Sequence, residues 1–484
     1  MRSHKNATAP GYANQASARP ALRHSLHDVP SPTRRPLCLL GALCLLALPA
    51  CVTPPSAKRT TETSPPVAAL DSKKDALPRW RASLSDLNTL FAGLDVSLIL
   101  HESPRDPLPA LSPDVRARMA ALAETCVLAP DEKLVFARIH GPETPFPDHQ
   151  PLRQLAMART ILARFALAEH DLARAEYLVS ANLAQARATF AAQEGLIPLI
   201  HAISIWQSAL EGVEALAASP DLTPVEAHRL LAVLQGDDKL AQSALAAAMK
   251  GEFEFVYRVI VERMPQTDDP DLLLSAIGSL GMAPPEPLKS GELGIGRTDT
   301  LLLDVPATLA AYEADLASYF VALKKSSRLP RGLYADTTAQ TLAGYRKELG
   351  AFYDYATLDE PSTPASLAKV RNALEGATNP GGKLLACFLT PPWETLFTSA
   401  LRREAHRAAI CGLLAWRIHG RPAPWSELTD ILPAPPADPF SDGPLRVALT
   451  PTPRIWSVYT NGTDNGGTLV DDNIGQPDDL VWTP

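Results

Sequence analysis

Between Leu152 and Ala217 the chain reads LRQLAMARTILARFALAEHDLARAEYLVSANLAQARATFAAQEGLIPLIHAISIWQSALEGVEALA, and this stretch decides the fold. Its large apolar residues recur three or four positions apart, which is the spacing of a helix that buries one face. Glu169, His170 and Asp171 interrupt the pattern and predict a turn between two helices. Alanine fills most other positions, so the helices can approach closely as an antiparallel hairpin. The two apolar stripes comprise Leu155, Leu162 and Phe165, then Leu172, Ala175, Val179, Ala186 and Phe190.

Helical spacing continues beyond this hairpin. We expect a third helix over residues 199–217, in which His201 and Trp206 point inward, and a fourth over residues 224–234. Hydroxyl–proline pairs mark helix starts, because Ser or Thr caps the first turn and Pro fits the first helical position. These pairs are Ser112-Pro113, Thr223-Pro224 and Thr363-Pro364, and Glu226 completes a capping box with Thr223. Further helices are predicted over residues 239–261, 306–325, 337–355 and 364–374.

The central hairpin resembles the units that stack in tetratricopeptide-type solenoids, where antiparallel helix pairs pack side by side. A 34-residue period is not found in the sequence. The fold class we predict is therefore mainly α over about residues 80–420, built from antiparallel helical hairpins in a tetratricopeptide-like array. A small C-terminal α+β region follows.

Composition and charge narrow the class of protein. The 484 residues include 45 basic and 53 acidic side chains, and a net charge of -8 argues against a nucleic-acid-binding surface. A hydrophobic share of 46% is enough to bury a core. The 46 prolines are about twice the usual share, which predicts short elements or stiff extended linkers.

The first 51 residues have the layout of an export signal. Arg34 and Arg35 precede an apolar run over residues 37–48, which is too short to span a bilayer as a stable helix. The sequence Leu48-Pro49-Ala50-Cys51 resembles the bacterial lipobox, which implies a diacylglycerol on the sulfur of Cys51. Val52, in place of Asp, favours the outer membrane of a two-membrane bacterium. An ordinary secretory signal with an incidental Cys51 is the alternative.

Changes in composition divide the chain into four parts. Residues 1–51 are a disordered n-region plus a lipoprotein signal peptide, and residues 52–78 are a Pro/Thr/Ser-rich tether. Residues 79–389 form an α-helical domain, and residues 390–484 form a long helix with a β-hairpin tail. The mature part keeps three cysteines, which allow one disulfide, although burial as small apolar residues is favoured for each. They are Cys126, Cys387 and Cys411.

The C-terminal part predicts a helix over residues 397–419 that ends at Gly420, a typical C-cap. A short helix over residues 425–432 follows, and Asp438 begins a turn that opens a strand. Residues 446–449 and 454–459 alternate as in a β-hairpin.

Several motifs of this part occur in one order: HGRP at 419–422, DPFSDGPL at 438–445, SVYTNGTDNGG at 457–467 and DDLVW at 478–482. This order resembles the C-terminal region of the major pseudopilin of type II secretion, and it covers about 90 residues. The segment is preceded neither by a methylation-type leader nor by a long apolar polymerisation helix, so we do not carry filament assembly over.

The resemblance implies a calcium ion held by a loop rich in Asp, Asn and Gly, whose oxygens suit this ion. The candidate ligands are Asn461, Asp464, Asp471, Asp472, Asp478 and Asp479. The alternative is that they are polar turn residues, because Asn, Asp and Gly dominate turns.

Catalytic motifs give little support for an enzyme. The sequence lacks HExxH, GxSxG, CxxC and GxxxxGK[ST], which are the usual signals of four enzyme or nucleotide-binding classes. We therefore expect a lipid-anchored, non-enzymatic binding or scaffold protein of the cell envelope, facing the periplasm, with an envelope protein of unknown identity as its partner. An envelope hydrolase with dispersed catalytic residues is the alternative, and a perturbed acid–base pair in a cleft would favour it.

Overall fold

A computed structural model describes the chain from residue 75 onward. The described residues are 75–94, 108–136, 147–192, 195–237, 240–265, 303–325, 393–459, 462–467 and 479–484, with 272, 276, 379–382 and 385. They are mainly helical with one small antiparallel sheet, which confirms the predicted fold class at this level. Cys51, the tether before residue 75, and the expected helices over 337–355 and 364–374 lie outside the described residues.

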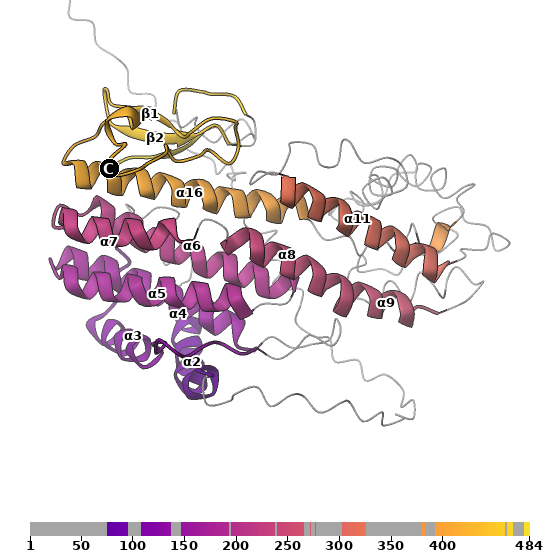
Figure 1. The fold of residues 1–484 in the computed structure, drawn as a ribbon. Helices are drawn as coiled ribbons and strands as arrows, with labels where there is room; N and C mark the ends of the chain where they lie inside the picture. The colour runs from indigo at the N-terminus through magenta and orange to yellow at the C-terminus, as the bar shows by residue number, and fades with distance from the viewer. Residues whose placement is uncertain are drawn as a thin grey trace, which may run out of the picture. The chain divides into compact units, whose positions relative to one another are not determined.

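Three long helices form the centre of the fold (Figure 1). They are α4 (His149–Ala168), α5 (Leu172–Ala192) and α6 (Leu196–Ala218), and each packs against the other two. The turn predicted between α4 and α5 is confirmed, and His170 takes a left-handed φ of 58° there. Asp171 follows it and accepts a hydrogen bond from the Arg174 backbone N–H at 3.0 Å.

Helix α6 is the most apolar of these elements. It also packs against α8 (Leu240–Glu252) and α16 (Trp393–His419), and His201 and Trp206 are buried as expected. By length and composition α6 could cross a membrane, but 67% of its apolar window is buried by the rest of the protein. This burial is what a core helix shows.

Capping chemistry places the shorter helices. Helix α3 (Pro113–Thr125) begins after Ser112, whose Oγ accepts the Val115 N–H, and packs with α2 (Leu77–Ala92) beside α4. Helix α7 (Pro224–Gln235) begins with the complete Thr223–Glu226 capping box. Both predicted starts are confirmed.

The helix expected over residues 239–261 is not one regular helix. Helix α8 is followed by the π-helical segment η3 (Phe253–Tyr257) and by α9 (Arg258–Arg263). Phe253 and Tyr257 are both buried, and Tyr257 stacks on Tyr312 of α11 (Val305–Lys325) at 5.1 Å. The wider π turn lets two large aromatic rings face the core from one short segment.

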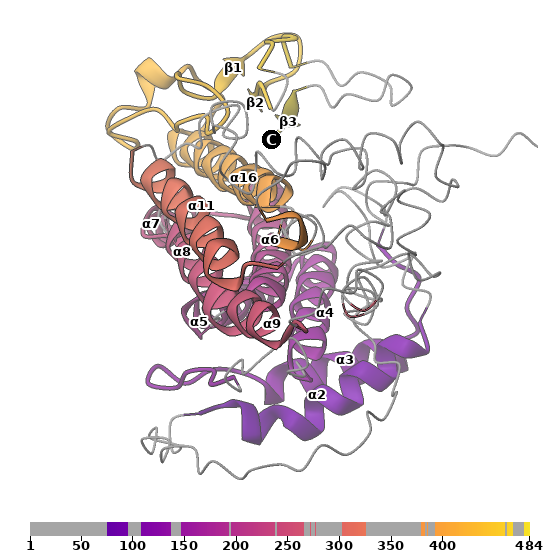
Figure 2. The ribbon, with the colours of Figure 1, turned by 90° about the vertical axis from the view of Figure 1, so that its right-hand side faces the viewer.

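The C-terminal residues form a small β module, which comprises residues 423–459, 462–467 and 479–484. Its strands β1 (Arg446–Ala448), β2 (Arg454–Ser457) and β3 (Leu480–Trp482) form an antiparallel sheet in the order β1-β2-β3. Val447 pairs with Ile455, and Ile455 pairs with Trp482. Figures 1 and 2 both show the sheet lying over α16, which ends before Gly420 at φ 83°.

Two details of this module differ from expectation. The short helix expected over residues 425–432 is only the 3-10 turn η5 (Trp425–Glu427), because Pro424 and Pro433 confine the segment. Strand β3 was not expected, since three residues are too few to show alternation. Helix α16 packs against α6, α7 and β2, so one apolar core runs from the helices to Leu445 and Ile455 of the module.

Candidate functional site

A group of buried and half-buried polar side chains lies where α6 meets α16, and we call it the junction cluster. Helix α6 contributes Gln207, Glu211 and Glu214, which share one face because they are four and three residues apart. Helix α16 contributes Arg403 and His406, also three apart. Sequence reasoning missed this cluster, because Glu214 and His406 are 192 residues apart and each helix face alone resembles an ordinary amphipathic pattern.

The shortest of the cluster's contacts to α16 joins His406 to Glu214. The His406 Nε2 and Glu214 Oε2 atoms are 2.7 Å apart, and the two side chains are only 8% and 11% exposed. Water screens such a pair weakly, so its contribution depends on close geometry and on the other groups that surround it. A bond of 2.7 Å meets the first requirement.

The remaining groups of the cluster surround this pair. Glu211 accepts a hydrogen bond from Gln207 Nε2 at 2.6 Å. Burial raises the pKa of Glu211, although the Gln207 bond and the positive charges of His406 and Arg403 oppose this shift. Burial also lowers the pKa of Arg403 to about 10. The cluster thus brings two carboxylates and two basic groups together in a poorly hydrated region.

The β module closes the cluster with two aromatic residues. The Trp482 ring of β3 stacks on the His406 ring, with centroids 5.8 Å apart and an interplanar angle of 11°. Tyr459, which follows β2, takes a positive φ of 47° and packs edge-on against Phe440 at 5.1 Å. A left-handed conformation at a bulky residue stores strain that its surroundings must hold in place. Three segments of the chain therefore meet at this point.

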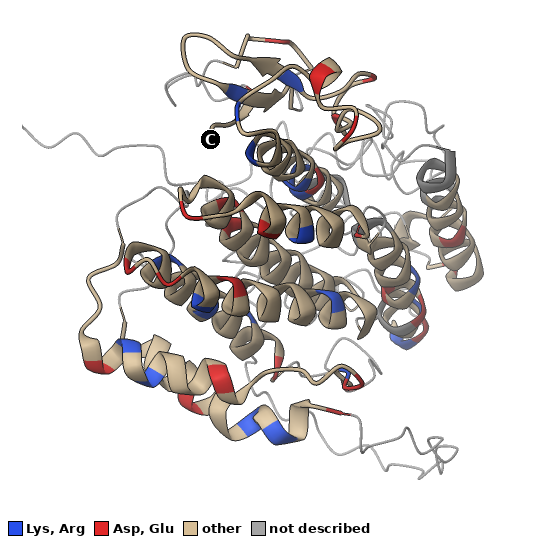
Figure 3. Ribbon diagram, turned by 60° about the vertical axis from the view of Figure 1, so that its left-hand side comes forward, with Lys and Arg blue, Asp and Glu red and all other residues tan. Residues whose placement is uncertain are grey.

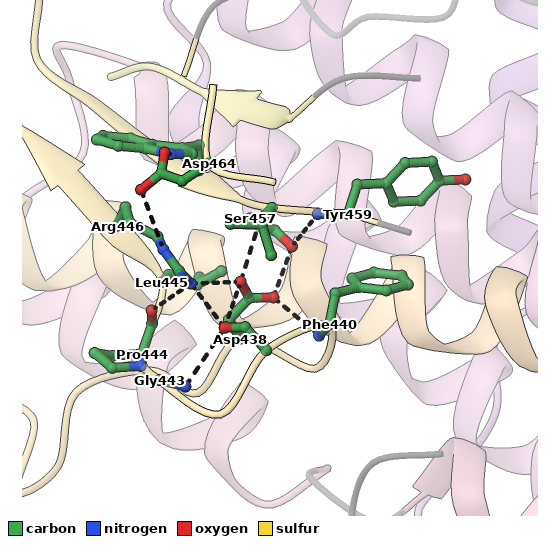
Figure 4. A network of polar contacts seen from close by, with 12 residues as sticks. Asp438, Phe440, Gly443, Pro444, Leu445, Arg446, Ser457, Tyr459 and Asp464 are labelled. Atoms are coloured by element: carbon green, nitrogen blue, oxygen red, sulfur yellow. Dashed lines mark hydrogen bonds and ion pairs between the residues drawn. The ribbon is translucent and has the colours of Figure 1, made fainter. Parts of the chain in front are cut away.

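A second polar network holds the module itself together (Figure 4). Asp438 has a fully buried side chain whose Oδ2 lies 2.8 Å from Arg446 Nη1. Its other donors are the Ser457 and Ser441 hydroxyls and the backbone N–H groups of Phe440 and Val458. The sequence predicted only a turn at Asp438. The structure shows that this carboxylate also fixes β1, β2 and the segment between α16 and the sheet.

Two of the six candidate calcium ligands lie among the described residues. Asp464 Oδ1 accepts the Trp456 indole N–H at 3.0 Å and the Gly466 N–H at 2.9 Å, and its Oδ2 is 3.7 Å from Arg446 Nε. Asp479 Oδ2 accepts the backbone N–H groups of Asn465 at 3.0 Å and Gly467 at 2.9 Å. The other four, Asn461, Asp471, Asp472 and Asp478, lie outside the described residues.

These contacts show how far the described loop suits calcium. Burial works against ionisation of Asp464, but the bonds from Trp456 and Gly466 and the charge of Arg446 outweigh it, so the pKa of Asp464 lies below its usual range. An ionised carboxylate beside glycines at φ 70° and 66° has the chemistry of a calcium loop. Calcium takes six to eight oxygens, so most of the ligands would come from the four candidates outside the described residues. Among described residues, His, Cys, Asp and Glu form no group of three that could hold a metal ion.

The two described cysteines, Cys126 and Cys411, are free and buried, as expected for small apolar residues. Burial raises the pKa of the Cys411 thiol to about 12, so this thiol is not a reactive nucleophile at neutral pH. Comparisons with known protein families, with curated proteins and with solved structures find no match to this chain.

Proposed function

We propose that this protein is a lipid-anchored, non-enzymatic binding or scaffold protein of the cell envelope. The observation that best supports the scaffold role is the position of α16, which packs against α6 and α7 and also against β2. A helix shared in this way makes the helical array and the β module move together. A partner bound at one part would then be held in a fixed relation to the other.

The contacts of the junction cluster agree with a mechanical role. The bond between Glu214 and His406 joins α6 to α16, and the bond that Glu211 accepts from Gln207 lies within α6. A catalytic acid or base must reach a substrate within hydrogen-bond distance. The cluster instead joins α6, α16 and β3.

Membrane attachment through Cys51 is the part of the proposal that is simplest to test. Cells that express the intact chain should incorporate labelled palmitate into it, and the protein should fractionate with the outer membrane. Cys51→Ser should abolish the label and release the protein in soluble form, whereas Cys411→Ser should leave both unchanged. Equal labelling of wild type and Cys51→Ser would show that Cys51 is not the anchor.

Within this proposal, the helical hairpins act as a tetratricopeptide-like binding array and the β module as a pseudopilin-like cap that calcium stabilises. Asp464 and Asp479 would contribute carboxylates to the ion, with Asn461, Asp471, Asp472 and Asp478 as the other candidates. Calcium bound only by the folded state must raise the melting temperature by mass action.

The calcium test compares melting of the intact protein in millimolar calcium and in EGTA. We expect a higher melting temperature in calcium, and we expect the combined change Asp464→Ala and Asp478→Ala to remove the difference. Asp430→Asn, at an exposed position of the same module, is the matched control and should keep it. Identical melting of the wild-type protein in both buffers would exclude the site.

The His406–Glu214 pair is an observation that favours the hydrolase alternative, because a histidine oriented by a carboxylate is a common general base. A panel of chromogenic ester, amide and glycoside substrates tests this alternative directly. Hydrolysis that disappears in His406→Gln and persists in His419→Gln would replace the scaffold proposal by the enzymatic one.

A further inference from the structure

The junction cluster has a charge balance that depends on one proton. With His406 protonated, two carboxylates (Glu211 and Glu214) face two cations (Arg403 and His406), and the cluster is neutral overall. Loss of the imidazole proton leaves two carboxylates, three residues apart on one face of α6, with Arg403 as their positive neighbour. Charge imbalance is costly here, because the His406 and Glu214 side chains are about nine-tenths buried.

The β module contacts the junction cluster directly, so a change in the cluster's charge affects strand β3. Trp482 stacks on the imidazole of His406, and a protonated ring binds an aromatic face more strongly than a neutral one. Strand β3 has no partner other than β2 within the described sheet, and it is three residues long. Backbone pairing with β2 holds β3 along one edge, and the stacking of Trp482 on His406 adds its contact to α16.

We propose that the junction cluster is a proton-dependent latch, which holds strand β3 against α16 while His406 is protonated and loosens it as that proton is lost. Histidine as a residue type changes charge between pH 5 and 8 in model peptides, so this is the pH range over which the latch is tested below. The bond to Glu214 survives deprotonation as a neutral contact of about half the strength. The latch therefore loosens β3 without unfolding the helices.

The direction of the effect follows from the groups around His406. Helix α6 presents Glu211 and Glu214, and α16 carries Arg403 three residues before His406. The segment after β2 presents Tyr459, which lies near enough to Arg403 to interact with its charge. Towards α7, Arg407 donates to the Leu234 carbonyl and pairs with Glu404.

Hydrogen exchange in the intact protein tests the latch. Exchange at pH 5.5 and pH 8.0, corrected for the intrinsic pH dependence of amide exchange, should show at least a tenfold loss of protection at pH 8.0 in β3 and in its partners 455–457. Helices α4 and α5 serve as the internal reference and should keep their protection. Equal corrected protection of β3 at both pH values would overturn the proposal.

Two variants separate the latch from general packing. His406→Gln keeps a donor to Glu214 but carries no charge, so β3 should exchange rapidly at both pH values. His419→Gln is the matched control on the same helix, since His419 lies 3.9 Å from Glu427 at a more exposed site. If β3 in His406→Gln keeps the wild-type pH dependence of hydrogen exchange, a group other than His406 causes that dependence.

A spectroscopic titration decides the question if the variants fold poorly. The fluorescence of Trp482, obtained as the difference between the intact protein and Trp482→Phe, should follow a single protonation between pH 5.5 and 8.0. A difference signal that stays constant over this pH range would overturn the latch proposal. This test needs no substitution at His406.

Discussion

At the scale of single residues, buried polar groups determine how the described segments are joined. Arg159 is 1% exposed and lies between three helices. Its Nη1 donates to Gln185 Oε1 of α5 at 2.6 Å, and its Nη2 contacts the Ala123 and Cys126 carbonyls at the end of α3. The negative end of the α3 dipole thus balances a charge that burial disfavours, consistent with the lowered pKa of about 10 for Arg159.

Replacement of Arg159 by Met should lower the free energy of unfolding by about 3 kcal/mol, because several buried acceptors lose their donor. Arg159→Lys should recover only part of this loss, since an ammonium group cannot reproduce the planar fork of a guanidinium. Urea denaturation followed by circular dichroism gives the measurement. Arg118→Met, at an exposed position of α3, is the control and should unfold as the wild type does.

Glu252 contributes to the free energy of unfolding by an amount that decreases as pH rises. Burial raises its pKa to about 7, although its Oε2 accepts the Leu196 N–H at the start of α6. The folded chain therefore binds a proton that the unfolded chain releases above pH 4.5, and this stability is lost as pH rises through 7.

Glu252→Gln keeps the acceptor for Leu196 and removes the charge. We expect this variant to be more stable than wild type at pH 8 by about 3 kcal/mol, which corresponds to the size of the pKa shift, and nearly equal to it at pH 4.5. Urea denaturation at both pH values measures the gap. Glu254→Gln, at a more exposed neighbouring position, should show no such divergence.

At the scale of helices and strands, local sequence signals located most element starts. Ser112-Pro113 and Thr223-Pro224 mark helix starts because the caps depend on residues three positions apart. The π segment at Phe253–Tyr257, the 3-10 turn at Trp425–Glu427 and strand β3 were not predicted. Each of these depends on packing against distant residues, which periodicity within one segment does not report.

The capping box of α7 gives a prediction of its own. Thr223→Ala removes the acceptor for the Glu226 N–H, and we expect a loss of about 1 kcal/mol in the free energy of unfolding. Thr223→Ser keeps the hydroxyl and should restore most of that loss. The melting temperatures of the wild type and the two variants give the comparison. Equal values for all three would show that the cap of α7 does not contribute to the stability of the protein.

The candidate sites illustrate the same limit. Asp464 and Asp479 were predicted from a local Asp, Asn and Gly pattern, and the structure places them on one loop through bonds to neighbouring backbone groups. The junction cluster could not be predicted, because Glu214 and His406 are 192 residues apart in the chain. Only the packing of α6 on α16 brings them together.

At the scale of the molecule, charged residues of both signs are interspersed along the helices (Figure 3), so the pH dependence of stability arises mainly from buried groups. The rings of His149 and His201 lie side by side, with centroids 5.5 Å apart and an interplanar angle of 54°. Burial lowers the pKa of His149 to about 3 and that of His201 to about 4. Below pH 6.5 the unfolded chain takes up protons that the folded chain does not, so stability falls with acid. Glu252 has the opposite sign, and its range overlaps that of the histidines between pH 4.5 and 6.5. Two histidines outweigh one glutamate there, so we expect the stability maximum at about pH 7.

His201→Phe should make the acid side of this profile shallower, with about 3 kcal/mol less loss between pH 6.5 and pH 4. Melting temperatures across this range, referenced to each protein's value at pH 7, measure the slope. His228→Phe, at an exposed position of α7, is the matched control and should keep the wild-type slope. An unchanged slope in His201→Phe would mean that other groups cause the acid loss.

The packing of α6 on α16 also fixes the order in which the chain can mature. During synthesis α6 emerges long before α16, and contacts between segments so far apart slow folding. Helices α4 and α5 can already cover part of α6, but the apolar face that α16 covers stays exposed in this interval, which makes the nascent chain prone to aggregation. A chain truncated before residue 393 should therefore remain with holding chaperones or be degraded. Residues 393–484 are therefore needed before the helical array can complete its fold.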